Sequence, residues 1–405
     1  LRNSSAASDV YKRQSYIFEK EFSMNKIYFD NAATTEISEK VISEMMKAMK
    51  VNYGNPSSTH SHGRNSKVIL ELSRKTIAEK FNVNPKEIIF TSGGTESNNM
   101  IIKTVVIAQN IERIISTKIE HKAVLNSIES IAKERGITIL FLDVDEYGVP
   151  NKQQLIEYLE NSDEKTLVSL MHINNETGTM IDLEEFGKIC KSNNALFHSD
   201  TVQTIGHYNI DLDKINIDFM TCSAHKFHGP KGVGFAYIKN GQTVKPFIEG
   251  GDQERGYRGG TESIHNIVGL KTAIDISYEN LENDSKKVKE LKDHFIKTVM
   301  ERIPETKING KHNINESSYA ILNLCLPINS DKKTILNFKL DLAGISCSSG
   351  SACQSGSSQP SHVLSEMLSD DDMKKISLRF SFSKFNTIKE VNYVVEFLKN
   401  FVEEN

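Results

Sequence analysis

The sequence predicts an α/β fold in which a large domain, with an open and mostly parallel sheet flanked by helices, is followed by a smaller α+β domain. Two observations indicate this class. Between residues 88 and 238, short apolar runs typical of strands alternate with segments typical of helices, which is the order of parallel sheets covered on both faces. After a charged amphipathic helix at 284–302, strands at 320–326 and 378–382 are mixed with helices.

Length and composition fit a globular protein of about two to three domains. The chain has 405 residues, of which 38% are hydrophobic and 25% charged, and a formal net charge of −4. It has no long basic block and no apolar run of membrane-spanning length, so we expect no direct contact with nucleic acid or membrane. The five cysteines form no CxxC pair, which argues against disulfides and structural zinc and for a reducing compartment. The lack of a recognisable targeting signal predicts the cytoplasm, and an organelle is the alternative if residues 1–23 belong to the protein.

The N-terminal residues differ in composition from the rest of the chain. The stretch LRNSSAASDVYKRQ lacks the apolar core of a secretory signal, and we interpret residues 1–23 as a non-native or disordered extension before Met24. We expect residues 24–38 to join the small domain, residues 39–284 to form the large domain, and residues 285–405 to form the small C-terminal domain.

The first helices are expected on either side of a polar loop. Apolar residues recur at helical spacing between Val41 and Met49, and we expect this face, including Met46, to lie in the core. The segment 53–64 is rich in turn formers and predicts a loop, with a second helix over 65–81. The two histidines of the loop have no partner at metal-binding spacing, so we expect no metal site.

A glycine-containing turn follows the strand predicted at 88–90. Residues Thr91 to Glu96 are small, polar or glycine, and a helix is expected from Asn98. A strand, a turn and a helix N-terminus in this order can bind a phosphate through backbone N–H groups. A plain connection between a strand and a helix fits equally well, and the turn is neither a P-loop nor a GxGxxG motif.

Polar residues follow the carboxyl ends of several predicted strands, among them those at 166–171 and 196–198. Ligands of open parallel sheets bind at this edge, so we expect a single site there. The residues are His172, Asn174, Asn175, Asp200, Gln203, His225 and Lys226.

Lys226 lies in a tight connection between two predicted buried strands. Burial lowers the pKa of a lysine, and a neutral amine can form a Schiff base with a carbonyl group. This stretch by itself favours a lysine on a surface turn, because most lysines are exposed. The other motifs reverse that preference.

Residues 346–358, SCSSGSACQSGSS, place Cys353 in a stretch rich in serine and glycine. This composition cannot bury apolar surface and predicts a mobile loop. A thiol contributes no packing there, so we interpret Cys353 as a nucleophile that must travel; a linker with an incidental thiol is the alternative. The other thiols discussed are expected to be packed: Cys190 and Cys325 in the core, and Cys347 beside a strand-like stretch at 342–345.

The motifs resemble those of cysteine desulfurases, which are pyridoxal-phosphate enzymes of the class V aminotransferase group. The matching stretches are SAHKFHGPKG around Lys226, FTSGGTESNN at 90–99, HINNET, SDTVQ, and SSGSAC ending at Cys353. The resemblance extends from about Ile27 to Phe401 and implies fold type I. The long serine- and glycine-rich loop resembles the housekeeping branch, which supplies iron–sulfur scaffold proteins and tRNA-thiolation enzymes.

The resemblance also implies how pyridoxal 5′-phosphate is held. Lys226 would bind the cofactor covalently, Asp200 would pair with its ring nitrogen, and Gln203 would hydrogen-bond its phenolic oxygen. His121 would stack on the ring and assist proton transfer, and Asn175 would also contact the cofactor. The phosphate would be bound by Gly94, Thr95, Ser223 and His225, and by Thr261 of the partner subunit in a homodimer.

For the reaction, the resemblance implies conversion of L-cysteine to L-alanine, with the sulfur kept as a persulfide on Cys353. Asn175 and Arg379 would hold the substrate carboxylate, with Asn31 nearby, and Lys226 would be the base. If Cys347 pairs with Cys353 on oxidation, the enzyme would be inhibited.

Three other activities are weighed against this one. A selenocysteine lyase or an aminotransferase on the same fold needs no carrier thiol such as Cys353. A non-catalytic sulfur-trafficking protein would not need Lys226, Asp200, His121 and Cys353 together. A nucleotide enzyme built on the glycine turn lacks the Walker lysine.

Overall fold

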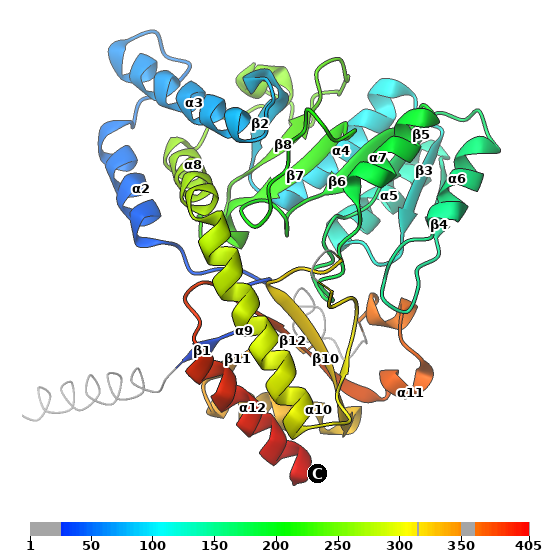
Figure 1. Ribbon diagram of the computed structural model, residues 1–405. Coiled ribbons are helices and arrows are strands. Elements are labelled where there is room, and N and C mark those ends of the chain that lie inside the picture. The colour runs from blue at the N-terminus through cyan, green and yellow to red at the C-terminus, as the bar shows by residue number, and fades with distance from the viewer. Residues whose placement is uncertain (1–25, 314–315, 350–360, 405) are drawn as a thin grey trace, which may run out of the picture.

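The computed structural model describes residues 26–313, 316–349 and 361–404. Its largest element is a seven-stranded sheet with the strand order β2-β8-β7-β6-β5-β3-β4 (Figure 1). The strands from β7 to β4 are parallel, whereas β8 is antiparallel to both β7 and β2. The predicted α/β class with a mostly parallel sheet is therefore confirmed. The strands are β2 (Ile88–Thr91), β3 (Arg113–Thr117), β4 (Thr138–Leu142), β5 (Thr166–Ser169), β6 (Leu196–Asp200), β7 (Phe219–Ser223) and β8 (Gly234–Ile238).

Helices cover both faces of this sheet because its strands carry apolar residues on both sides. In β2, Ile88 and Phe90 join the core on one face and Ile89 the core on the other, as the two-residue period of a strand requires. The first core includes residues of α3, α6, α7 and α8, and the second includes residues of α4 and α5. The helices are α2 (Glu39–Val51), α3 (Ser61–Lys80), α4 (Gly94–Gln109), α5 (Lys122–Arg135), α6 (Lys152–Glu160), α7 (Leu183–Ser192) and α8 (Ile264–Glu279).

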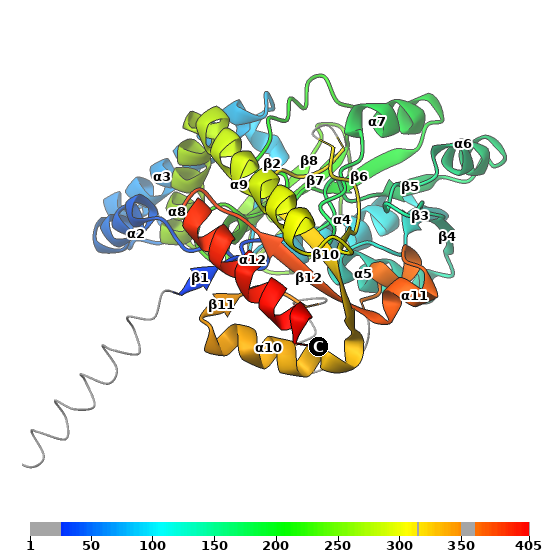
Figure 2. The ribbon, with the colours of Figure 1, turned by 60° about the horizontal axis from the view of Figure 1, so that its bottom comes forward.

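Helix α9 (Leu281–Arg302) runs from the seven-stranded sheet to the C-terminal part of the chain (Figure 1). A smaller sheet and the helices beside it form that part, which we call the second layer. There β10 (Ile321–Asn329) pairs antiparallel with β12 (Lys375–Ser381) and with β9 (Lys307–Ile308). The helices α9 and α12 (Ile388–Glu403) pack together beside this sheet (Figure 2). The remaining elements are α10 (Lys333–Leu342), α11 (Asp370–Met373) and a parallel pair of β1 (Ile27–Tyr28) with β11 (Ile345–Ser346).

An aromatic cluster holds the N-terminal segment to this second layer. Phe29, directly after β1, lies 5.2 Å from Phe382 and 6.3 Å from Phe295 between ring centroids, in edge-to-face geometry. All three rings are buried. Such aromatic pairs add to the hydrophobic gain of burial, so the chain's first described residues are fixed beside its last strand.

Several expected helix boundaries are wrong. Helix α3 begins at Ser61, inside the predicted loop, because the His60 side chain accepts a hydrogen bond from the Gly63 N–H at 3.3 Å and caps the helix. Helix α4 begins at Gly94 rather than Asn98, and the stretch at 342–345, expected to be strand-like, begins as the end of α10.

The expected burial of the α2 methionines is also only partly correct. Val41 is buried, but Met46 and Met49 are 52% and 50% exposed. The helix contacts α8 with another part of its apolar face, where Met45 lies against Gly269. In the described parts of the chain, no helix combines the length and the apolar character needed to cross a membrane.

Candidate active site

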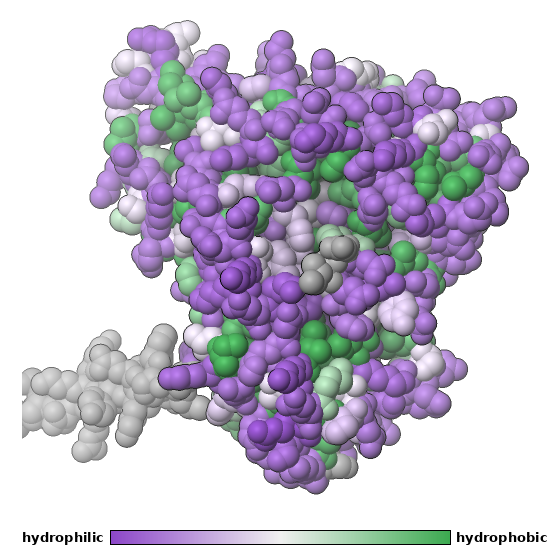
Figure 3. All heavy atoms as spheres, in the orientation of Figure 1, coloured by the Kyte–Doolittle hydropathy of each residue, from purple (hydrophilic) through white to green (hydrophobic). Residues whose placement is uncertain are grey.

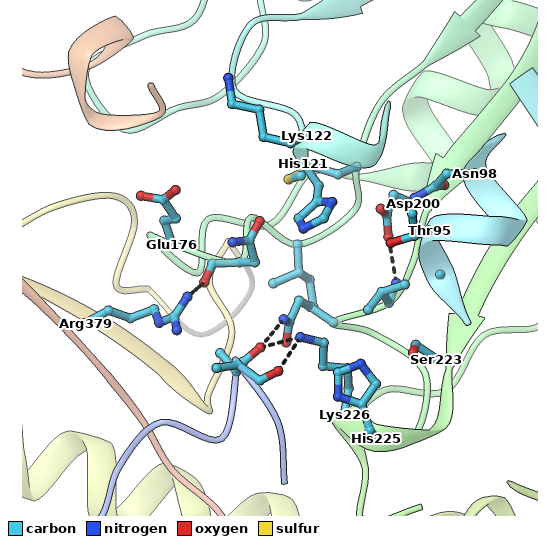
Figure 4. Close-up of a pocket in the computed structure, with 18 of the residues that line it drawn as sticks. Thr95, Asn98, His121, Lys122, Glu176, Asp200, Ser223, His225, Lys226 and Arg379 are labelled. Atoms are coloured by element: carbon cyan, nitrogen blue, oxygen red, sulfur yellow. Dashed lines mark hydrogen bonds between the residues drawn. The ribbon is translucent and has the colours of Figure 1, made fainter. Parts of the chain in front are cut away.

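A cavity of about 300 Å³ lies at the carboxyl edge of the seven-stranded sheet (Figure 4). The chain brings most of the predicted site residues together here, from strand ends, helix N-termini and the second layer. Those that line the cavity are Gly94, Thr95, His121, Asn175, Asp200, Gln203, Ser223, His225, Lys226 and Arg379.

Asp200, the last residue of β6, provides a buried carboxylate. One oxygen accepts a hydrogen bond from Asn98 Nδ2 at 2.7 Å, and the other from the Val202 N–H at 3.0 Å. Across the residues that the structure describes, Asp200 has no ion-pair partner within 4.0 Å. Its negative charge therefore remains available to a cationic group in the cavity.

Lys226 ends a short 3₁₀ turn, η2 (Ala224–Lys226), directly after β7. Its Nζ donates to the carbonyl oxygens of Ala32 and Ala33 at 2.7 and 2.8 Å (Figure 4). Gln203 Nε2 donates to the same Ala32 oxygen at 3.0 Å. The N-terminal segment thus forms one wall of the cavity, and Lys226 lies half-buried against it rather than on a surface turn.

The N-terminus of α4 forms another wall. Gly93 precedes the helix with φ +146°, in a region that favours glycine. A Cβ atom on Gly94 would lie only 2.6 Å from Val202 Cγ2, so larger residues do not fit. Free N–H groups and the dipole at such a helix start attract an anion. The structure favours a phosphate site here more clearly than the sequence does, because α4 begins within the glycine turn itself.

Two histidines that line the cavity differ in their hydrogen bonding and surrounding charge. His121 caps α5, with its Nδ1 accepting from the Ala123 N–H at 3.1 Å, and its ring points into the cavity (Figure 4). Burial, together with the positive charges of Lys226 and Lys231, lowers the pKa of His225 to about 4. The His225 ring is therefore uncharged at neutral pH.

Arg379 of β12 brings a guanidinium group to the cavity from the second layer. It is 2% exposed; Nη2 contacts Asp30 Oδ1 at 2.7 Å and Ser348 Oγ at 2.9 Å, and Nη1 donates to the Asn175 oxygen at 2.9 Å. Its Nε is buried and has no partner within the described ranges. A fixed, incompletely satisfied guanidinium is suited to binding a carboxylate.

This cavity is not lined by four of the predicted residues, Asn31, His172, Asn174 and Thr261. The His172 ring bonds the Thr204 hydroxyl, and the Asn174 amide donates to the Ile119 carbonyl oxygen. Asn31 is buried, donates to the Ser381 oxygen at 2.8 Å, and lines a small neighbouring cavity that Lys226 and Gln203 also border. Thr261 is exposed and does not line the cavity of its own chain. Cys353 lies outside the described residues, so its expected loop conformation and any pairing with Cys347 stay predictions.

The sequence interpretation missed other lining residues, including Asn98, Glu176 and His362. Asn98 follows Gly94 by four positions in α4, which places both on one face of the helix. This spacing could have indicated Asn98 if the helix start had been placed correctly. His362 belongs to none of the recognised motifs.

The residues present fit pyridoxal 5′-phosphate. Lys226 supplies the amine, Asp200 a buried anion for the ring nitrogen, and the glycine-lined start of α4 a phosphate cradle. When bound, this cofactor withdraws electrons from an attached amino acid. A mostly parallel sheet with these groups at its carboxyl edge defines a pyridoxal-phosphate enzyme.

Comparisons with known proteins narrow this class. A model of the aminotransferase class-V family matches residues 27–394. Cysteine desulfurase IscS of Clostridium botulinum is 40% identical over 386 residues, 94% of this chain and 96% of the relative. A putative cysteine desulfurase, IscS 1, of Bacillus subtilis is 39% identical and covers 94% and 99%. The chain belongs to the aminotransferase class-V family and, within it, to the cysteine desulfurases.

Solved structures agree with this assignment. A NifS-like protein superposes with a TM-score of 0.85 at 36% identity, covering 94% of this chain and all of the other. A NifS-like protein from Rickettsia africae gives a TM-score of 0.82 at 31% identity with the same coverage. The protein SspA, solved in complex with cysteine, gives 0.74 at 29% identity over 89% of this chain and all of the other.

Proposed function

We propose that this enzyme converts L-cysteine to L-alanine and keeps the sulfur as a persulfide on Cys353. The carbon–sulfur bond of the substrate breaks and a sulfur–sulfur bond forms, so L-cysteine and the Cys353 thiol give L-alanine and the Cys353 persulfide. Atoms and electrons balance without an outside oxidant. Release of the carried sulfur as sulfide needs a thiol reductant.

The contacts of the described residues on either side of the 350–360 segment carry this proposal. Before the segment, the Ser348 side chain contacts Arg379, as described above. After it, Ser361 Oγ donates to Glu176 Oε2 at 2.5 Å, and Glu176 also lines the cavity. Ser348 and Ser361, on either side of the stretch that contains Cys353, are therefore each bonded to a residue that lines the same site, as transfer of sulfur to Cys353 requires.

The state of the other thiols supports Cys353 as the carrier. Burial raises the pKa of Cys190, Cys222 and Cys325, and raises the pKa of Cys347 to about 12. The thiolate is the reactive form of cysteine, so these four are poor nucleophiles at neutral pH.

The remaining roles follow the chemistry of each side chain. Arg379 and Asn175 hold the substrate carboxylate, and Lys226 and His121 move protons at the reacting carbon. Asp200, Gln203, Asn175, Ser223, His225 and the start of α4 hold the cofactor. Residues 39–284 form the cofactor domain, and residues 285–405, joined by 24–38, form the domain with the carrier cysteine.

The proposed working form is a homodimer, in which Thr261 reaches the phosphate in the partner subunit's site. An apolar surface on α2 and α3 supports this form, since it has no cover within the described chain (Figure 3). Leu72→Glu should convert the dimer to a monomer in light scattering; Phe338→Glu, on α10, should not. The exposed apolar residues of these helices are Met46, Met49, Val51, Val68 and Leu72, and Tyr53 lies in the connection between them.

The sulfur acceptor is proposed to be an iron–sulfur scaffold protein or a tRNA-thiolation enzyme, in the cytoplasm. The test of the activity itself is alanine formation from L-cysteine by the purified holoenzyme, with and without a thiol reductant. Sustained alanine release that needs the reductant, and that Lys226→Ala and Cys353→Ala abolish, supports the proposal. Alanine release indifferent to Cys353→Ala would instead indicate a lyase that expels sulfur without a carrier.

A further inference from the structure

A third histidine lines the cavity, and none of the roles above uses it. His362 Nε2 lies 2.9 Å from the carbonyl oxygen of Glu120. A carbonyl oxygen can only accept, so Nε2 carries a proton, and Nδ1 of the neutral ring carries a lone pair. This Nδ1 is buried and has no hydrogen-bond partner in the described part of the chain. Buried acceptors are rarely left unpaired without a functional reason.

The surrounding turn fixes the ring in place. The backbone N–H groups of Val363 and Leu364 donate to Ser361 Oγ at 3.2 and 3.1 Å, while Ser361 itself bonds Glu176. Val363 is buried in a small cluster with Ile119. His362 is therefore held on both sides and is not a freely rotating surface side chain.

The charges around the ring favour its neutral form. Burial is the main cause that lowers the pKa of His362, and the positive charge of Lys122 and the His121 ring, at the start of α5, lower it as well. The Glu120 carbonyl and the Glu176 carboxylate, from two other segments, oppose this shift. At neutral pH the ring can thus accept a hydrogen bond at Nδ1.

We propose that Nδ1 of His362 accepts a hydrogen bond from the thiol of L-cysteine and so makes His362 a specificity-determining residue of this site. The inference rests on the proposed function, since it assumes a thiol-bearing substrate held by Arg379. The contact orients the substrate sulfur while its proton stays on sulfur. No proton or electron is transferred in this step.

Two amide variants separate this role from that of a structural anchor. His362→Gln keeps an N–H near the position of Nε2, which can still bond the Glu120 carbonyl, but it has no acceptor in place of Nδ1. His362→Asn keeps a polar group near the position of Nδ1 and loses the bond to Glu120. The affinities for L-cysteine and for L-alanine, which lacks only the thiol, can be measured by calorimetry on holoenzyme with Cys353→Ala, in which transfer to Cys353 is blocked.

We expect His362→Gln to weaken binding of L-cysteine by about five- to tenfold, the effect of one hydrogen bond, and to leave L-alanine binding unchanged. His362→Asn should have the smaller effect on the ratio of the two affinities. An unchanged affinity for L-cysteine in His362→Gln, or an equal loss for both ligands, would overturn the proposal.

The pH profile gives a second, independent readout. In holoenzyme with Cys353 intact, kcat/KM for L-cysteine should fall as the pH decreases through the lowered pKa of His362, because the protonated ring cannot accept. This decline should be absent in His362→Gln; the same decline in both proteins contradicts the inference. A wild-type enzyme that forms no alanine would defeat the proposed function, whereas the calorimetric ratio would still test His362.

Discussion

At the scale of single residues, Asp200 has the setting most specific to cofactor binding. The residue is 7% exposed, and its carboxylate is hydrogen-bonded only by neutral donors. Asp200→Asn removes the charge but keeps the shape, and the remaining oxygen can still accept from the Val202 N–H. We expect the rate of alanine formation to fall by roughly 100-fold or more, as for loss of a preorganised charge, with little change in thermal unfolding.

Asp218 offers a matched control for this variant. It precedes β7, whereas Asp200 ends the neighbouring parallel strand β6, so the two lie at opposite edges of the sheet. Its carboxylate accepts from the Phe197 N–H and from Gln242 Nε2, both at 2.9 Å. Asp218→Asn should leave the rate unchanged. Equal rates for Asp200→Asn and the wild type would contradict the assigned pairing.

The residue-level predictions succeed where a simple rule applies. Asp200 and Gln203 lie at and just after the end of β6, and Lys226 lies just after β7. These two strands are parallel neighbours. Ligands of open sheets bind at the carboxyl ends of the strands, and this rule predicts that the three side chains lie together. Asn31 and His362 depend on how the two layers meet. No local pattern contains that information: Asn31 lines the neighbouring cavity, its contact with substrate stays a prediction, and His362 was missed.

At the scale of elements, a buried ion pair attaches the loop after β8 to α3. Arg74 Nη1 and Nη2 contact the two carboxylate oxygens of Glu254 at 2.7 and 2.8 Å, and both side chains are 2% exposed. Glu254 also accepts the Phe90 N–H at 2.8 Å, although its own backbone has φ +46°. The pair thus holds a strained turn against the edge strand β2.

Removing one partner should be costly, because the other is left as a buried charge. Glu254→Ala is expected to lower the free energy of unfolding by about 3–5 kcal/mol in urea denaturation. Lys188→Ala, which removes the exposed pair with Glu184 on α7, should leave this free energy unchanged because water screens the pair. A similar result for the two variants would refute the role of burial.

Element types were easier to predict than element ends. The alternation of strands and helices gave the correct order, since it depends on periodicity alone. The start of α3 depends on the His60 side chain as a cap, which is not among the preferred capping residues. The burial of Met46 and Met49 depends on what covers α2, and periodicity identifies an apolar face without identifying its cover.

At the scale of the whole molecule, buried histidines should make the fold sensitive to acid. His198 in β6 is fully buried, its Nδ1 is 2.8 Å from Ser169 Oγ, and burial lowers its pKa to about 4. An unfolded histidine has a pKa near 6.5. Between these values the unfolded chain binds more protons, so the free energy of unfolding decreases as the pH falls from about 6.5 towards 4.

The stability that the neutral His198 ring contributes is fully present above about pH 6.5. Below that pH, the free energy of unfolding decreases by up to about 1.4 kcal/mol per pH unit for this one ring. His198→Phe should reduce the pH dependence of urea unfolding between pH 7 and 5, whereas His312→Gln, at an exposed position, should not. An identical slope in His198→Phe and the wild type would show that this ring is already protonated in the folded protein.

The sequence predicts the fold class of the whole molecule, but it does not predict how the seven-stranded sheet and the second layer are arranged. The parallel pairing of Ile27 with Ile345 joins segments at opposite ends of the chain, and the short strands involved have no pattern that selects each other. The same pairing brings Ala32 and Ala33 to Lys226. The exact domain boundaries and the roles of the site residues stay predictions.

The measurement that tests the central claim most directly is peptide mass spectrometry of the holoenzyme after brief exposure to L-cysteine without reductant. The account predicts one additional sulfur atom on the peptide containing Cys353. It predicts none on Cys190, Cys222, Cys325 or Cys347, whose thiols have raised pKa values. Alanine formation with no added sulfur on Cys353, or with sulfur on another cysteine, would contradict it.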